Sequence, residues 1–273
     1  MLPSELKTVL AKIAVGEGLI TALTGAGISA ESGIPTFRGK EGYWTIGSTE
    51  YHPQAMATFA MFREQPMEVW RWYLYRRGVC HRAEPNAGHL ALAALEAIFD
   101  DRFLLITQNV DGLHLRAGNS LRRTYQIHGN IDFMRCADAC TDEIFLLPAG
   151  FWLKTKDDPL PQNVESVLRC PRCGGITRPH VLWFDEYYDE TNYRFNSSLR
   201  AADRTALLLV VGSSGATNLP LQVAGLVGGH GGVIVDVNVQ PNPFSEYAED
   251  TGGFSLQSSA SSVLPEIVSA LGG

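Results

Sequence analysis

Five apolar runs constrain the fold of this chain more than any other feature. They are "LITALTG" (19–25), "FLLITQNV" (103–110), "TYQIHG" (124–129), "ALLLVVGSS" (206–214) and "GVIVDVNV" (232–239). Continuous apolar runs are typical of strands that are buried on both faces, as in a parallel sheet. Because helical patterns lie between the runs, the sequence predicts an α/β fold with a Rossmann-type, doubly wound parallel sheet.

Two of the intervening helices can be placed from residue spacing. In "PNAGHLALAALEAIFDD", Asn86 can cap a helix that we expect to point Leu90, Leu95 and Ile98 toward the core. A second helix is predicted near the C-terminus, where apolar residues keep helical spacing: Val263, Leu264, Ile267, Val268 and Leu271.

Composition narrows the classes of protein that fit. The net charge of −7 and the pI near 5.5 argue against a nucleic-acid scaffold, so no direct nucleic-acid partner is expected. The stretch "MLPSELKTVLAKIAVGEG" lacks the basic region and unbroken apolar run of a signal peptide. No apolar run approaches the roughly 18 residues that span a bilayer. We therefore expect a cytoplasmic protein without a membrane partner.

Four of the five cysteines form two pairs, Cys136-x3-Cys140 and Cys170-x2-Cys173. In a reducing compartment such pairs indicate a metal before a disulfide. Four thiolates can make a closed tetrahedral zinc site, and one Zn²⁺ held in this way would be structural because no ligand position stays open. The alternative is four reduced cysteines without metal. Cys80 stands apart and is expected to be a small buried apolar residue.

Two segments interrupt the strand–helix alternation. Residues 40–82 are rich in aromatics and helix formers, and residues 133–180 hold the four paired cysteines. A chain of 273 residues can form one sizeable core with a smaller satellite. We predict a discontinuous Rossmann-type domain made of 1–39, 83–132 and 181–273. The helical module 40–82 and the zinc module 133–180 would form the small domain.

The stretch "GAGISA" after the first run matches the pattern G-x-G-x-x-A. Gly25 and Gly27 allow a tight turn and a close approach to a pyrophosphate, and Ala30 allows close helix–strand packing. The alternative is a tight turn with no ligand. Residues 42–54, "GYWTIGSTEYHPQ", supply no second strand ending in Asp or Glu. This disfavours a dehydrogenase that transfers hydride.

Polar side chains follow the second and third runs. Gln108, Asn109 and Asp111 follow one strand, and His128 follows the next. Because the carboxyl ends of parallel strands meet at the ligand crevice, we expect these residues to converge near the glycine turn. Histidine is the usual general base near neutral pH. The alternative is ordinary loop residues beside a core histidine whose hydrogen bonds are satisfied.

Together these motifs resemble the sirtuin family over nearly the whole chain. The resemblance rests on "GAGISAESGIPTFRG", "PNAGH", "TQNVDGLH", "IHGN", the paired cysteines, "RPHVLWF", "VVGSS" and "DVN", in family order. It implies a Rossmann-type NAD domain with a small zinc-plus-helical domain. It also implies NAD-dependent removal of acyl groups from lysines of proteins or peptides. NAD would be consumed, giving nicotinamide, free lysine and O-acyl-ADP-ribose.

The resemblance assigns roles to particular residues. The glycine-rich stretch would line the NAD site with Gly25, Ala26, Gly27, Ser29, Phe37 and Arg38. The catalytic residues would be Asn109, Asp111 and His128. The nicotinamide and its ribose would be surrounded by Gln108, Asn109 and Asp111. His128 would deprotonate a ribose hydroxyl. The adenosine half would be held by Gly212, Ser213, Ser214 and Asn238.

Two residues, Tyr73 and Arg76, bear on the identity of the acyl group. They lie on one face of a predicted helix that starts at Pro66. Spacing alone favours a core tyrosine beside a solvated arginine. The pair is similar, however, to the branch of the family that removes succinyl, malonyl or glutaryl groups. There the arginine and tyrosine bind the acyl carboxylate by charge-assisted hydrogen bonds. Ala57 falls where that branch has a small residue, so we expect desuccinylation to exceed deacetylation.

The segment "RPHVLWFDE" matches the family's lysine tunnel but departs from it at one residue. Val181, Trp183 and Phe184 are expected to form the apolar wall. Asp185 stands where the family usually has glycine, in the segment that pairs with the substrate peptide. A charged side chain there is expected to affect peptide pairing.

Two other functions are compatible with parts of the sequence. One is transfer of ADP-ribose to protein, or hydrolysis of NAD, on the same fold. The other is a non-catalytic module that senses NAD or mediates interactions through zinc. His128 argues against the non-catalytic module, and Tyr73 and Arg76 favour deacylation over ADP-ribose transfer.

Overall fold

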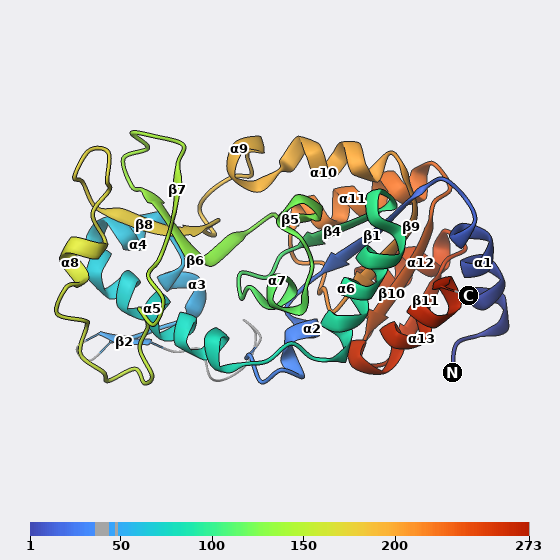
Figure 1. The fold of residues 1–273 in the computed structure, drawn as a ribbon, viewed down its shortest axis with the longest axis horizontal. Coiled ribbons are helices and arrows are strands. Elements are labelled where there is room, and N and C mark those ends of the chain that lie inside the picture. The colour runs from blue at the N-terminus through green and yellow to red at the C-terminus, as the bar shows by residue number, and fades with distance from the viewer. Residues whose placement is uncertain (36–43, 47–48, 273) are drawn as a thin grey trace.

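The structure is a computed structural model that describes residues 1–35, 44–46 and 49–272. Its main sheet is parallel throughout and has the order β11-β10-β9-β1-β4-β5 (Figure 1). Read from β5 and numbered along the chain, this is the 3-2-1-4-5-6 order of the Rossmann fold. The strands are β1 (Leu19–Thr24), β4 (Phe103–Thr107), β5 (Thr124–Gln126), β9 (Thr205–Val211), β10 (Val233–Asn238) and β11 (Phe254–Gln257). The predicted fold class is confirmed.

Successive residues of β1 point to opposite faces of the sheet, and both faces are covered. Ile20 and Ala22 belong to one apolar cluster, and Leu19 and Leu23 belong to the other. The first cluster is closed by α1 (Ser4–Ala14), α6 (Ala87–Phe99) and α13 (Ala260–Gly272). The second is closed by α10 (Phe195–Ala202), α11 (Asn218–Gly229) and α12 (Pro243–Asp250). Burial on both faces explains why the runs are continuously apolar.

Helix α6 begins as predicted, but its buried face differs from the prediction. The side chain of Asn86 accepts hydrogen bonds from backbone N–H groups of the first turn. Leu95 is buried, whereas Leu90 and Ile98 are 54% and 49% exposed. Leu92 and Leu95 define the inward stripe, and Leu90, two residues before Leu92, lies about 200° around the helix from it. The prediction that Leu90 and Ile98 point inward is therefore wrong.

Helix α13 follows the predicted pattern. The predicted apolar residues are buried or packed against the core, namely Val263, Leu264, Ile267, Val268 and Leu271.

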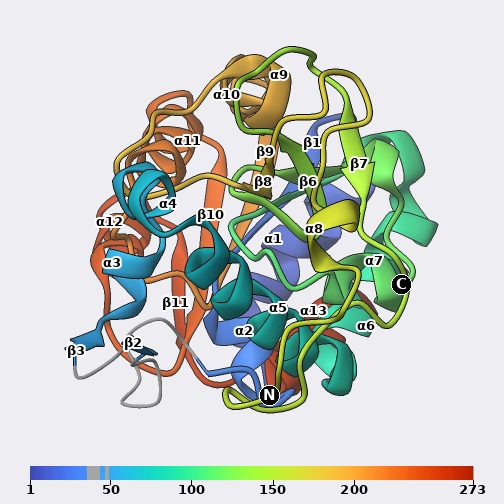
Figure 2. The same ribbon diagram turned by 90° about the vertical axis from the view of Figure 1, so that its left-hand side faces the viewer.

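A smaller unit lies at the end of the molecule opposite the two termini (Figure 1). It contains an antiparallel sheet of order β7-β6-β8 and the pair β2–β3. Its strands are β2 (Trp44–Ile46), β3 (Thr49–Tyr51), β6 (Gly129–Cys136), β7 (Ile144–Leu146) and β8 (Thr177–Val181). Its helices are α3 (Pro53–Met56), α4 (Phe59–Glu64), α5 (Pro66–Arg82) and α8 (Val164–Val167). Figure 2 looks onto this unit, where α5 packs against β6 and β8.

The remaining elements are short. They are α2 (Gly27–Ala30), α7 (Leu113–Ala117), α9 (Glu190–Tyr193) and the 3₁₀ turns Asp100–Arg102 and Leu121–Arg123. Strand β6 crosses the predicted domain boundary at 132/133, and β8 crosses the one at 180/181. The domain limits therefore stay a prediction. Among the described residues, no helix has the length and apolarity needed to cross a bilayer.

Candidate active site

The loops after β1 and β9 meet at the point where the strand order reverses, which is where Rossmann folds bind ligands. The amides of Gly25 and Gly27 donate to the carbonyls of Val211 and Gly212, both at 2.9 Å. A Cβ on Gly27 would lie 2.6 Å from Gly212 Cα, so contact between the two loops itself requires glycine. Of the three amides from 25 to 27, only that of Ala26 lacks a backbone acceptor among the described residues.

Ser29, Asn109 and Asp111 converge beside this glycine loop. The Ser29 hydroxyl donates to Asp111 Oδ2 at 2.7 Å, and Asn109 Nδ2 donates to the Gly25 carbonyl at 3.0 Å. Burial raises the pKa of Asp111, while hydrogen bonds from the Leu113 amide and the Ser29 hydroxyl lower it. The polar residues are therefore held in place by one another, as buried polar groups require.

Two histidines that sequence reasoning did not assign lie behind this group. The rings of His89 and His114 are 4.8 Å apart between centroids, and His89 Nε2 lies 3.4 Å from the Ser29 hydroxyl. Burial lowers the pKa of His89 to about 4 and that of His114 well below its usual range. Two neutral imidazoles can sit side by side without charge repulsion. Both stand in the quoted motifs "PNAGH" and "TQNVDGLH", but spacing does not reveal their contact.

Gln108 links the ends of β4 and β9. Its Nε2 donates to Ser213 Oγ at 2.9 Å, and its Oε1 accepts from the Thr217 hydroxyl at 2.9 Å. Asn238 Nδ2 donates to the Ser213 carbonyl at 2.8 Å, whereas Ser214 is exposed. The residues predicted for the adenosine half thus gather at the ends of β9 and β10. Phe37 and Arg38, also predicted for the NAD site, lie outside the described residues.

His128 lies between β5 and β6, at the same edge of the sheet as Gln108. Burial lowers the pKa of His128 to about 4, against the opposing effect of a hydrogen bond to the Gln108 backbone carbonyl. The imidazole is therefore neutral at pH 7, the state in which a base can accept a proton. Its Nε2 lies 2.7 Å from the hydroxyl of Tyr188, a residue that sequence reasoning did not single out. Nothing in the "EYYDE" spacing distinguishes Tyr188 from its neighbours.

The predicted acyl-binding residues come together on the small unit. The Tyr73 hydroxyl accepts a hydrogen bond from Trp183 Nε1 at 2.9 Å, and both side chains are buried. Ala57 and Val181 are also buried, whereas Phe184 is 60% exposed. Phe184 is therefore placed at the rim of any tunnel formed by the other residues.

The charge of Arg76 acts on two residues, Tyr73 of the predicted acyl-binding group and Asp111 beside the glycine loop. Burial raises the pKa of Tyr73, and the Arg76 charge opposes that rise. Burial likewise raises the pKa of Asp111, and the same guanidinium opposes that rise. Its Cζ lies 5.2 Å from the centre of the Trp72 ring. Arg76 thus lies near enough to Tyr73 and Asp111 to act electrostatically on both.

Asp185 has a local structural partner. Its carboxylate accepts hydrogen bonds from the amides of Phe59 and Ala60 at 2.7 and 3.0 Å, at the first turn of α4. Thr58 caps the same turn by accepting from the Met61 amide. The departure from the family's glycine therefore ties the segment after β8 to helix α4.

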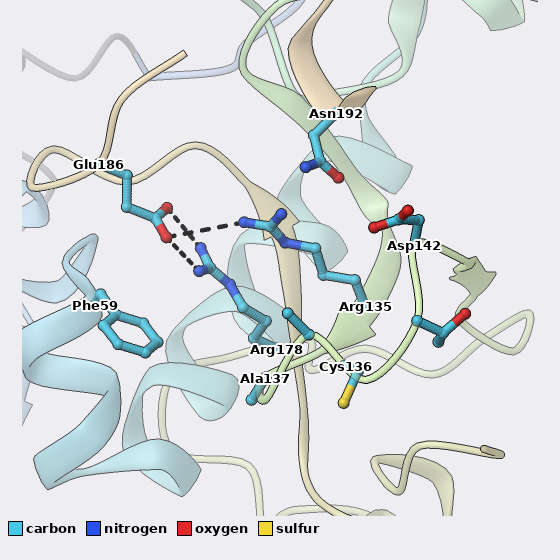
Figure 3. Close-up of a pocket in the computed structure, with 10 residues that line it drawn as sticks. Phe59, Arg135, Cys136, Ala137, Asp142, Arg178, Glu186 and Asn192 are labelled. Carbon is cyan, nitrogen blue, oxygen red and sulfur yellow. Dashed lines mark hydrogen bonds and ion pairs between the residues drawn. The ribbon is translucent and has the colours of Figure 1, made fainter. Parts of the chain in front are cut away.

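A cavity of about 270 Å³ lies beside the cysteine module, away from the glycine loop. Figure 3 shows that Glu186 binds Arg178 and Arg135 at its edge. The Arg178 guanidinium also stacks 3.6 Å from the centre of the Trp183 ring. These contacts hold Trp183, which belongs to the predicted tunnel wall. The crevice with Asn109 and Asp111 lies elsewhere.

The four predicted zinc ligands form one cluster. The sulfurs of Cys136, Cys140, Cys170 and Cys173 all lie within 4.8 Å of one another. Cys136 and Cys173, and likewise Cys140 and Cys170, are 3.6 Å apart. Zn–S bonds of about 2.3 Å in a tetrahedron place sulfurs about 3.8 Å apart, so the cluster fits zinc. Cys80 lies outside it and is buried, as predicted.

The fold and site define a Rossmann-type α/β protein with a histidine-bearing crevice and a four-cysteine metal module. The model of the Sir2 family matches residues 25–218. The chain belongs to the Sir2 family, the sirtuins.

Curated relatives and solved structures agree with this family. An NAD-dependent protein deacylase of Leptospira interrogans is 40% identical over 249 residues, 91% of either chain. The structure of a Sir2 homologue in complex with NAD matches with a TM-score of 0.79 and 32% identity, covering 99% of this chain and 94% of the other. A Sir2 homologue variant in complex with 2'-O-acetyl ADP ribose matches with a TM-score of 0.78, also at 32% identity, over 99% and 96% of the two chains.

Proposed function

We propose that this protein is an NAD-dependent protein-lysine deacylase that yields nicotinamide and an O-acyl-ADP-ribose. The observation that carries the proposal is the neutral His128 at one crevice with Gln108, Asn109 and Asp111, in a chain of the Sir2 family. The curated relative named a protein deacylase and the homologue bound to 2'-O-acetyl ADP ribose support the same reaction.

In this reaction NAD supplies the ribose that accepts the acyl group. Nicotinamide leaves C1′ of the ribose with its bonding electrons, and the acyl oxygen bonds to C1′. His128 then takes the proton from a ribose hydroxyl, so that its oxygen can attack the acyl carbon. The lysine amine leaves, and one water supplies the oxygen that completes O-acyl-ADP-ribose. Asn109 and Asp111 hold the nicotinamide ribose, and their mutual contacts through Ser29 keep them oriented before the substrate arrives.

The remaining predicted contacts complete the NAD site. Gly25 and Gly27 serve the pyrophosphate. The glycine-rich stretch lines the NAD site with Gly25, Ala26, Gly27, Ser29, Phe37 and Arg38. The adenosine half lies against Gly212, Ser213, Ser214 and Asn238. The division into a discontinuous Rossmann-type domain and a small domain of 40–82 and 133–180 belongs to the same proposal, with the site between them.

The acyl specificity that we propose favours acidic groups such as succinyl and malonyl, with acetyl also removed. The Tyr73 hydroxyl accepts from Trp183, which leaves its own O–H free to donate. Because burial raises the pKa of Tyr73, this side chain stays a neutral donor to a carboxylate. Arg76 supplies the positive charge, and the buried Ala57 leaves room for a longer chain.

The substitution His128→Ala tests the assignment of the base. We expect the variant to bind NAD and to melt within a few degrees of the wild type. The imidazole is only partly buried and neutral, so its removal leaves no charge unpaired. Deacylation should fall by at least about 100-fold, the contribution typical of general-base catalysis. Turnover of the variant at the wild-type rate would refute the role of His128.

A further inference from the structure

The base His128 is held by a side chain from a different segment. Tyr188 lies between β8 and α9, and its hydroxyl is 2.7 Å from His128 Nε2. The two rings are stacked, with centroids 5.8 Å apart and planes at 28°. The ring of Phe195 stacks against Tyr188 as well, at 6.1 Å and 24°. These two neighbouring rings position the phenol beside the imidazole.

The hydrogen bonds around His128 select one tautomer of the imidazole. The Gln108 backbone carbonyl can only accept, so the ring nitrogen that faces it carries the proton. Because Nε2 faces Tyr188, we assign the contact with Gln108 to Nδ1, which then carries the proton. Nε2 is then an acceptor, and the Tyr188 O–H donates to it. The lone pair needed for base catalysis is therefore on His128 Nε2, where it accepts the hydrogen bond from Tyr188.

Tyr188 is connected to the rest of the crevice through Thr217. Burial raises the pKa of Tyr188 to about 12, and the nearby Thr217 side chain opposes that rise. The Thr217 hydroxyl donates to Gln108 Oε1 at 2.9 Å. Thr217 thus lies beside both Tyr188 and Gln108, so the segment after β8 meets the ends of β4 and β9 next to His128.

We propose that Tyr188 is a positioning residue for the base, which holds the Nδ1–H tautomer of His128 and gives up Nε2 to a ribose hydroxyl of bound NAD. The inference rests on the proposed function. In the exchange, the Tyr188–Nε2 hydrogen bond breaks and Tyr188 keeps its proton. The ribose hydroxyl then donates to Nε2, and its proton passes to that nitrogen when the oxygen attacks the acyl carbon. The imidazolium later releases this proton to solvent.

The substitution Tyr188→Phe tests this role against the matched control Tyr187→Phe, which alters a neighbouring tyrosine that is 91% exposed. Wild-type turnover with NAD and a succinylated peptide, measured first, establishes the proposed function separately. The rates kcat and kcat/KM for NAD are then recorded from about pH 3.5 to pH 9 for all three proteins, so that the range includes the His128 pKa of about 4. Among the described residues, no charged side chain is a cause of the His128 pKa shift, and Tyr188 is the titratable group that contacts the ring.

Loss of a donor to the neutral imidazole raises its pKa, and kcat/KM reports the free enzyme, whereas kcat reports the bound one. Tyr188→Phe should therefore move the acidic limb of kcat/KM upward by about 0.5 to 1 pH unit and leave that of kcat in place. The Tyr187→Phe variant should match the wild type. If the acidic limbs of kcat/KM and of kcat both moved, NAD would not displace Tyr188 from Nε2. If neither limb moved, the role of Tyr188 would be overturned.

A second measurement does not depend on the variant. In the wild-type protein, ¹⁵N NMR of the histidine side chains should show His128 as the Nδ1–H tautomer, with a change at Nε2 on addition of ADP-ribose. An Nε2–H tautomer in the free protein would refute the inference even if Tyr188→Phe failed to fold.

Discussion

At the scale of single residues, Arg76 joins the acyl site to the ribose site. Its charge acts on the pKa values of both Tyr73 and Asp111, which come from different units of the fold. A carboxylate at the end of an acyl chain would find a neutral donor in Tyr73 and a cation in Arg76. For this reason we propose that the site prefers an acidic acyl group to acetyl.

Arg76→Met should reverse the acyl preference. Charge-assisted hydrogen bonds are worth about 1.5–3 kcal/mol, so desuccinylation should fall by about 10- to 100-fold while deacetylation changes little. Rates with matched succinyl and acetyl peptides measure this directly. Arg63→Met, which removes an exposed arginine from α4, is the control. Equal loss of both activities would count against a carboxylate clamp.

The polar residues of the site could be predicted one by one, but their partners could not. Asn109, Asp111 and His128 follow strands in the sequence, which was enough to place them at one edge of the sheet. Their contacts depend on groups brought in by folding, such as His89 behind Ser29. Tyr188 contacts His128 although the two are 60 positions apart in the sequence, so local residue spacing could not predict this contact.

At the scale of elements, the cysteine module joins two segments that are separated in sequence. Cys136 ends β6, and Cys170 and Cys173 flank a turn that precedes β8. A metal ion held by these thiolates closes a loop of chain that has little regular structure of its own. Folding of this module and metal binding are therefore expected to be coupled.

Cys173→Ser should abolish stoichiometric zinc binding and lower the melting temperature. Elemental analysis of the freshly purified wild type should find about one zinc per chain, as a single Cys₄ site requires. The control is Cys80→Ala, because Cys80 is buried outside the cluster and should leave the zinc content unchanged. Active wild-type protein without zinc would refute the metal site.

Element ends were harder to predict than element types. The run at 103–110 ends as a strand at Thr107, because the chain then turns so that Gln108 and Asn109 reach the crevice. Strand β11 (Phe254–Gln257) was not predicted, since its four residues are at least partly exposed at the sheet edge and form no long apolar run. Asp185 was predicted from family comparison to affect peptide pairing, but only the fold shows its two bonds to α4.

At the scale of the whole molecule, the chain crosses between its two units at β6, β8 and the segments around α5. The glycine loop after β1 and the loop after β9 close the crevice from the Rossmann side. On the small unit, Tyr73 and Trp183 are buried and hydrogen-bonded to each other. This layout fits a reaction between two substrates, in which NAD lies on the sheet and an acylated lysine enters from the small unit.

The identity of the products tests the central claim most directly. The protein should be incubated with NAD and with succinylated, acetylated and unmodified forms of one lysine peptide, and the products identified by mass spectrometry. We predict nicotinamide, free lysine peptide and O-succinyl-ADP-ribose in equal amounts, with less of the acetyl product and none from the unmodified peptide. ADP-ribosylated peptide, free ADP-ribose with the acyl peptide intact, or no loss of NAD would contradict the account.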